Sequence, residues 1–171
     1  MESRVKLLGH PIHPMLVVLP LGLFVMSVIF DALSLARDNV IFGVVAYWNI
    51  LAGVIGGLLA AVFGLIDWLA IPDGTRAKRI GLLHGGTNVL VVLLFAYSWW
   101  TRSNTVDAMP TTTLFAVQVI ALLMGAFAGW LGGELVDRLG VGVSPNANLN
   151  ARSSLDGPAE PARDAGPARA P

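Results

Sequence analysis

The sequence contains no cysteine among its 171 residues. This absence excludes disulfides, cysteine-ligated iron–sulfur clusters, covalently attached c-type haem and thiolate catalysis. Any redox centre in the chain must therefore use histidine or carboxylate ligands. Charge is also scarce, because charged residues make up 13% of the chain and the formal net charge is zero. Without a basic excess there is no electrostatic reason to expect a nucleic-acid partner.

What the chain has in abundance is hydrophobic sequence, which makes up 55% of it. Four stretches lack Asp, Glu, Lys and Arg, and each is long enough to cross a bilayer, which takes about 20 apolar residues. They are residues 7–30, 40–66, 80–101 and 108–133. None shows the alternating pattern of a barrel strand, so we expect an all-α, integral membrane four-helix bundle in the lipid bilayer.

This pattern sets the predicted boundaries. We expect one membrane domain over residues 1–143 and a disordered tail over residues 144–171, which are rich in Pro, Ala, Asn, Ser and Arg. The predicted helices are about 14–36, 42–70, 79–101 and 110–138. Nine of the 11 Lys and Arg residues would lie on the side of the two termini, and only Arg37 and Arg102 on the other. The positive-inside rule therefore predicts an inner-membrane protein with both termini in the cytoplasm.

The segment ahead of the first helix carries two of the three histidines, in the sequence His10-Pro11-Ile12-His13-Pro14. A residue before proline disfavours helical backbone, so we expect an extended lead-in and a helix that begins at Pro14. Pro20 lies inside this helix, where it cannot donate to Leu16 and should interrupt the helical hydrogen bonds.

Four-helix topology brings all three histidines to the face that carries the termini, together with two carboxylates. Imidazole and carboxylate groups bind transition metals, and helical bundles often hold such centres. The candidate metal ligands are His10, His13, His84, Asp67 and Glu134. Haem b would need one histidine from each of two facing helices, and His13 with His84 could provide this axial pair.

A purely structural interpretation of the same residues stays open. His10 and His13 could be polar caps in the headgroup region, where polar groups cost little. Asp67 and His84 would then form a hydrogen-bonded clasp, and Glu134 would pair with Arg138, one helical turn away. On the opposite side, Asp31 has no evident partner in the sequence. Gly53, Gly57, Gly64, Gly125, Gly129 and Gly133 would form close-packing seams, within the chain or in a homo-oligomer.

Several of these motifs together resemble the bacterial membrane-protein family known as domain of unknown function 2231. The resemblance is carried by Gly9–Pro14 with Leu19–Gly22, Gly64–Asp67, His84 with Asn88, Gly132–Val136 and Gly140–Val143. It implies a four-helix membrane module. The resemblance also implies that some members are joined to Rieske-type iron–sulfur domains, and hence that other membrane redox proteins are partners.

The leading functional hypothesis is therefore a redox accessory module that binds haem b or a transition metal. The alternative is a structural or assembly module without a cofactor. A third class, proton or small-ion transport by an oligomer, has little support because no charged residue lies in the middle of a span. We expect no catalytic residues, since the sequence has no nucleophile–base pair and no phosphate-binding loop.

Overall fold

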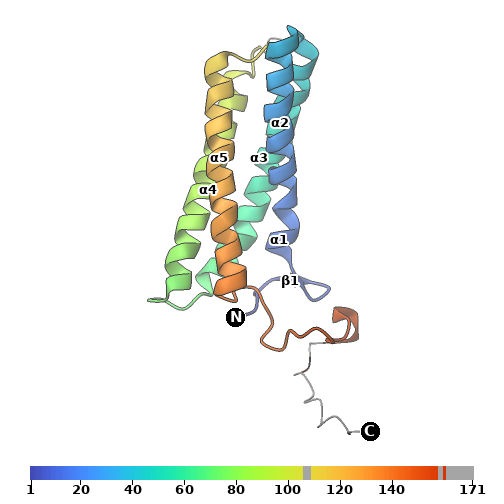
Figure 1. Cartoon of the computed structure of the whole chain (residues 1–171), viewed down its shortest axis with the longest axis vertical. Helices are drawn as coiled ribbons and strands as arrows, with labels where there is room; N and C mark the ends of the chain where they lie inside the picture. The colour runs from blue at the N-terminus through green and yellow to red at the C-terminus, as the bar shows by residue number, and fades with distance from the viewer. Residues whose placement is uncertain (106–108, 158–159, 161–171) are drawn as a thin grey trace, which may run out of the picture.

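The computed structural model describes residues 1–105, 109–157 and 160, and in it four long helical segments form an up-and-down bundle (Figure 1). The helices are α1 (Ile12–Leu16), α2 (Val18–Arg37), α3 (Val40–Leu69), α4 (Arg76–Thr101) and α5 (Thr112–Gly133), which continues as the π-helix η1 (Glu134–Arg138). Four segments are long and apolar enough to cross a membrane: Ile12–Arg37, Val40–Leu69, Arg76–Thr101 and Thr112–Arg138. The prediction of an all-α membrane bundle is confirmed, and the helix ends differ from the predicted ones by three residues or fewer.

Polar residues at the loops fix where three of the helices begin. The side chain of Asn39 accepts a hydrogen bond from the backbone N–H of Ile41, ahead of α3. Thr75 and Thr111 do the same at the starts of α4 and α5. Each cap satisfies a backbone donor that has no partner inside its own helix. The α2–α3 loop and the start of α5 lie at one end of the bundle, and the α3–α4 loop lies at the other.

The lead-in to the first helix is partly as expected. Strand β1 (Lys6–Leu7) pairs antiparallel with β2 (His10–Pro11), so His10 is extended as predicted. His13 is helical instead, because α1 begins at Ile12, and this part of the prediction is wrong. Pro14 is then the third residue of α1, within the first turn, where its missing N–H leaves no helical hydrogen bond unmade. The predicted interruption at Pro20 is confirmed, since α1 ends at Leu16 and α2 begins at Val18.

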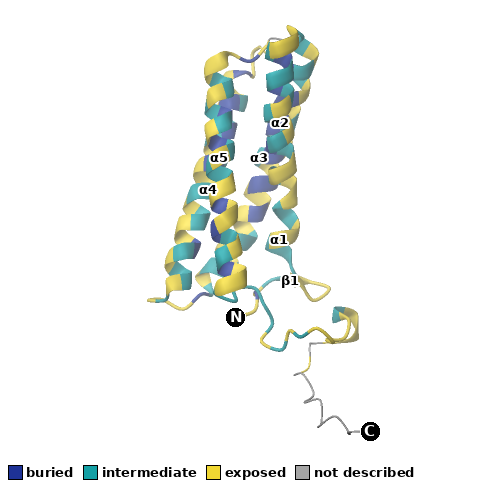
Figure 2. Cartoon of the chain, viewed as in Figure 1, coloured by how far each residue is buried: buried dark blue, intermediate teal, exposed yellow. Residues whose placement is uncertain are grey.

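The buried faces of all four long helices point toward the middle of the bundle (Figure 2). Its centre is a cluster of Phe24, Ile50, Val91, Phe95 and Ala121. Many large hydrophobic residues lie on the outer surface, as expected for a bundle whose solvent is lipid.

The glycines of α3 allow neighbouring helices to approach within the chain. A Cβ atom at Gly53 would lie 2.6 Å from the Phe24 ring, and one at Gly57 would lie 2.8 Å from Val92. These residues therefore form the predicted packing seam inside a single chain. Gly129 and Gly133 of α5 differ, because no described atom would lie within 4 Å of a Cβ atom at either position.

We call the end of the bundle that carries the N-terminus the terminal end. Here the Met1 ammonium group donates to the Gly140 carbonyl at 2.8 Å, and the Gly142 N–H donates to the Met1 carbonyl, also at 2.8 Å. The chain continues to a short 3₁₀ helix, η2 (Ser154–Asp156). Residues 158–159 and 161–171 of the predicted tail lie outside the described residues.

Candidate functional sites at the two ends of the bundle

Two of the predicted ligands, His13 and His84, meet near the terminal end. His13 comes from α1 and His84 from α4, and their ring centroids are 6.4 Å apart with the ring planes at 85°. Both side chains are half-buried. Nδ1 of His13 donates to the Ala60 carbonyl at 2.8 Å, and Nδ1 of His84 donates to the Ala128 carbonyl at the same distance. In a neutral imidazole, a bond of this kind places the proton on Nδ1 and makes Nε2 the acceptor.

A glycine lies against each imidazole. A Cβ atom at Gly64 would lie 2.8 Å from Cε1 of His13, and one at Gly132 would lie 3.2 Å from Cε1 of His84. In both cases the glycine is one helical turn beyond the residue whose carbonyl accepts the Nδ1 hydrogen bond. Asn88 adds a further contact, since its amide nitrogen is 3.4 Å from Nε2 of His84. Backbone carbonyls hold the two rings by hydrogen bonds, and the glycines leave the space that the rings occupy.

The other predicted ligands lie elsewhere at this end. His10 is exposed, and its Nε2 is 3.2 Å from the hydroxyl of Ser154. The carboxylate of Asp67 accepts from the hydroxyl of Ser3 at 2.8 Å and from the N–H of Arg4 at 2.9 Å. The predicted Asp67–His84 clasp is therefore wrong, because Asp67 fastens the N-terminal segment instead.

Glu134 also has a different partner from the predicted one. Its carboxylate pairs with the guanidinium of Arg76 at 2.6 Å, across the gap between η1 and α4. The predicted pair with Arg138 assumed α-helical spacing, whereas residues 134–138 form a π-helix, in which four-residue neighbours no longer line up. Within the described part of the chain, no group of three or more His, Asp or Glu side chains could hold a metal ion. The structure brings together two of the five predicted ligands.

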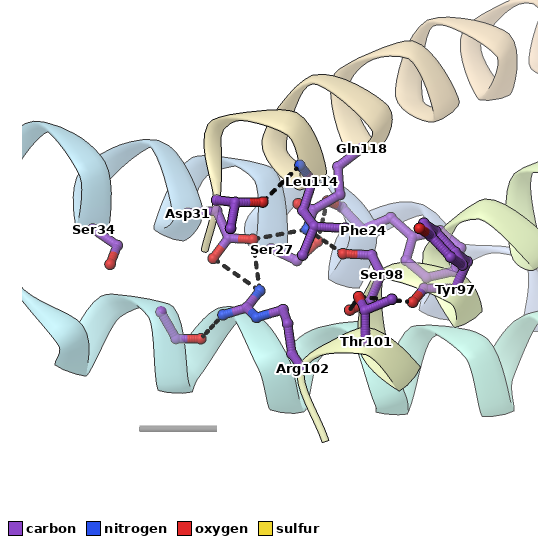
Figure 3. Close-up of polar contacts among 12 residues, drawn as sticks. Phe24, Ser27, Asp31, Ser34, Tyr97, Ser98, Thr101, Arg102, Leu114 and Gln118 are labelled. Atoms are coloured by element: carbon purple, nitrogen blue, oxygen red, sulfur yellow. Dashed lines mark hydrogen bonds and ion pairs between the residues drawn. The ribbon is translucent and has the colours of Figure 1, made fainter. Parts of the chain in front are cut away.

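A second polar cluster, built around Asp31 and Arg102, lies near the opposite end of the bundle (Figure 3). Asp31 is fully buried and Arg102 is 3% exposed. Nη1 of Arg102 donates to both carboxylate oxygens of Asp31, at 2.9 and 3.1 Å, and Nη2 donates to the Gly43 carbonyl at 2.7 Å. The expectation that Asp31 lacks a partner is wrong.

Two further side chains complete this cluster. The amide nitrogen of Gln118 donates to Asp31 and to the hydroxyl of Ser98, at 2.8 Å in each case. Among the described residues, Nε of Arg102 and Oε1 of Gln118 are buried without a hydrogen-bond partner. Removing either member of a buried ion pair leaves a charge without compensation, at a typical cost of about 3–5 kcal/mol. The cluster therefore holds α2, α3, α4 and α5 in one arrangement.

The signal for this pair was present in the sequence. Arg102 follows α4 directly, and Asp31 lies near the end of α2, which runs in the same direction. The positive-inside rule predicts that Arg102 lies at the membrane surface, because a single arginine beyond a predicted span usually lies there. In the fold α4 ends earlier than α2, so Arg102 lies level with the last turns of α2 and is buried between the helices.

Four membrane-length helices, with polar side chains paired across their centre, define an all-α integral membrane protein. The family model described as a predicted membrane protein, DUF2231, matches residues 9–145, and the chain belongs to this family. Neither a curated protein nor a solved structure matches the chain.

Proposed function

We propose that this protein is a membrane redox module that binds haem b, with His13 and His84 as the two axial ligands. The observation that carries the proposal is the meeting of these two imidazoles, from α1 and α4, at a centroid separation of 6.4 Å. A metal–imidazole bond is about 2.0–2.1 Å long, so two imidazoles on opposite sides of one metal ion have ring centres roughly 6 Å apart. The observed centroid separation is close to this value.

The hydrogen bonds around the two rings support the same role. Histidines that bind a metal usually donate their other ring N–H to a carbonyl or a carboxylate, which fixes the ring and raises its basicity. Both Nδ1 atoms make such a bond here, to the carbonyls of Ala60 and Ala128. The nitrogen left to bind a metal is then Nε2 in both residues.

The number of donors favours haem over a bare metal ion. A zinc or copper site takes three or four ligands from the protein, and within the described residues no such group exists. A porphyrin supplies four nitrogens itself, so two histidines complete the coordination of its iron. A bound haem would supply a one-electron centre at the terminal end of the bundle. The distribution of basic residues supports a cytoplasmic position for this end.

One observation favours a second candidate, a structural module without a cofactor. Each imidazole already donates one hydrogen bond and packs against a glycine, so the two rings could serve only to hold α1 on α3 and α4 on α5. Such a role would need no ligand on Nε2. The two candidates therefore differ in whether His13 and His84 are needed for a bound cofactor or for stability alone.

The deciding experiment compares histidine variants of the full chain, purified in detergent from haem-replete cells. We expect a Soret band in the wild-type spectrum and in His10→Ala, which is the matched control because His10 is exposed and bonded to Ser154. His13→Ala and His84→Ala should each lose the band. Adding imidazole to His84→Gly should restore part of it, because a free imidazole can occupy the vacated ligand position.

Each other outcome contradicts the proposal in a distinct way. A wild-type protein that shows no Soret band, even after titration with haemin, supports the structural module. Stoichiometric metal by mass spectrometry without a Soret band would replace haem by a two-histidine metal site. A band that survives in either His13→Ala or His84→Ala would remove that residue as a ligand.

A further inference from the structure

The first and third membrane spans repeat one another. When residues 13–27 are compared with residues 84–98, at a shift of 71 positions, six of the 15 pairs are identical. These pairs are His13/His84, Val18/Val89, Leu19/Leu90, Leu23/Leu94, Phe24/Phe95 and Ser27/Ser98. They include the candidate ligands and the central aromatic pair. The agreement also extends to burial, since Phe24, Phe95, Ser27 and Ser98 are all buried.

The second and fourth spans repeat as well, at a shift of 68 positions. Gly57, Ala60 and Gly64 of α3 correspond to Gly125, Ala128 and Gly132 of α5. The matching residues have matching roles. Ala60 and Ala128 accept the Nδ1 hydrogen bonds of the two histidines, and Gly64 and Gly132 lie against the two imidazoles. Each half of the chain is thus one helical hairpin with its own histidine, carbonyl acceptor and glycine.

Corresponding residues meet each other across the centre of the bundle. His13 contacts His84, and Phe24 stacks on Phe95 with centroids 3.9 Å apart and planes at 1°. Asp31 and Arg102 are also corresponding positions at the shift of 71, and they form the buried ion pair. Contact between a residue and its own counterpart marks a two-fold axis. Since both hairpins begin at the terminal end, this axis runs along the helices, as in transporters with parallel repeats.

We propose that the chain is a tandem duplication of one hairpin. We further propose that Asp31 and Arg102 make the first hairpin pair with a second hairpin, and not with another first one. If the first hairpin paired with another first hairpin, two Asp31 carboxylates would meet in a buried position. Pairing of two second hairpins would bring two Arg102 guanidinium groups together. Burying like charges side by side is strongly unfavourable, so the opposite charges select the pairing seen within one chain. The partner recognised by each hairpin is the other copy.

Charge reversal in the full-length chain tests this selection. Asp31→Arg gives a chain with arginine at both corresponding positions, and Arg102→Asp gives one with aspartate at both. Neither chain can form the ion pair within itself, but hairpins of one chain complement hairpins of the other. We therefore expect the two variants, carrying different tags and expressed together, to co-purify about tenfold more than two differently tagged wild-type chains. The free-energy cost of an unpaired buried charge exceeds what a tenfold change in the association equilibrium requires.

The double variant Asp31→Arg/Arg102→Asp restores the pair in reversed order. Arg102 also uses the Gly43 carbonyl, and the position that corresponds to Gly43 is Thr111, so an arginine at position 31 would have an equivalent carbonyl nearby. We expect this variant to be a monomer, with a thermal midpoint closer to that of the wild type than either single variant shows.

The control uses an ion pair away from the axis. Arg76→Glu and Glu134→Arg, expressed together, should give no more mixed complex than the wild type, because that pair is partly exposed to solvent. Two results would overturn the proposal. One is a mixed Asp31→Arg and Arg102→Asp complex no more abundant than the wild-type background, including the case in which neither chain accumulates. The other is a double variant as unstable as the worse single variant.

Discussion

Replacing Arg102 by methionine should cause one of the largest losses of stability that a single substitution can produce in this protein. The carboxylate of Asp31 is fully buried and accepts two hydrogen bonds from Arg102 and one from Gln118. Without the guanidinium it keeps only the neutral amide donor. Breaking a buried pair by removing one partner costs about 3–5 kcal/mol. We expect a loss of this size in the free energy of unfolding, measured by tryptophan fluorescence during titration of mixed micelles with a denaturing detergent.

Two companion variants separate the buried charge from other effects of the substitution. Arg76→Met breaks the pair with Glu134, whose side chains are 53% and 20% exposed, and should cost no more than about 1 kcal/mol. Asp31→Leu with Arg102→Met removes both charges and should recover most of the loss, since a buried pair can often be replaced by apolar side chains at little cost. A loss below about 1 kcal/mol for Arg102→Met alone would refute the reasoning.

Two further predictions concern the terminal end. Gly64→Ala would place a Cβ atom 2.8 Å from Cε1 of His13 and should cost about 1–3 kcal/mol in the same unfolding assay, whereas Gly22→Ala, with no described atom within 4 Å, should be neutral or slightly stabilising. Asp67→Ala removes the acceptor for the Arg4 N–H, so trypsin should cleave at Arg4 faster than in the wild type while the helical circular dichroism stays the same. An unchanged cleavage rate would show that Asp67 does not fasten the N-terminal segment.

Much of the fold follows from the sequence because the bilayer allows few alternatives. A charge-free stretch of 20 or more residues has to cross as a helix, and short loops between such stretches have to reverse the direction of the chain. The interruption at Pro20 is local chemistry, so it could also be predicted. His13 shows the limit, because whether a residue before proline is extended or helical depended on where α1 begins.

The side-chain partners were harder to predict because they depend on rotation and depth. Asp67 and His84 come from adjacent helices at one end, yet each bonds to a different neighbour. Glu134 turned toward Arg76 because the chain winds as a π-helix at that point. Neither the rotation of a helix about its axis nor a local change of helix type can be deduced from hydropathy. Predicting that residues share one end of a bundle therefore does not predict that they touch.

The internal repeat indicates which residues lie at the same depth in the bundle, and the repeat can be recognised in the sequence. Aligning the chain with itself at a shift of 71 is enough to pair His13 with His84 and Asp31 with Arg102. If the two hairpins are related by an axis along the helices, corresponding residues lie at equal depth by symmetry. A residue close to the axis must then meet its counterpart, which is how opposite charges far apart in sequence form a buried pair.

The two polar pairs on this axis differ in what they leave available for a ligand. At one end the carboxylate of Asp31 takes donors from Arg102 and Gln118, and Nη2 of Arg102 is bound to the Gly43 carbonyl, so the pair is committed to holding helices together. At the terminal end each imidazole uses Nδ1 for a carbonyl, which leaves Nε2 as the nitrogen that a ligand could reach; at His84 the Asn88 amide nitrogen lies 3.4 Å from it. A site on a two-fold axis that offers two corresponding imidazole nitrogens suits a ligand that is itself bound from two opposite sides. For this reason the histidine pair, rather than the stronger ion pair, is where ligand chemistry should be sought.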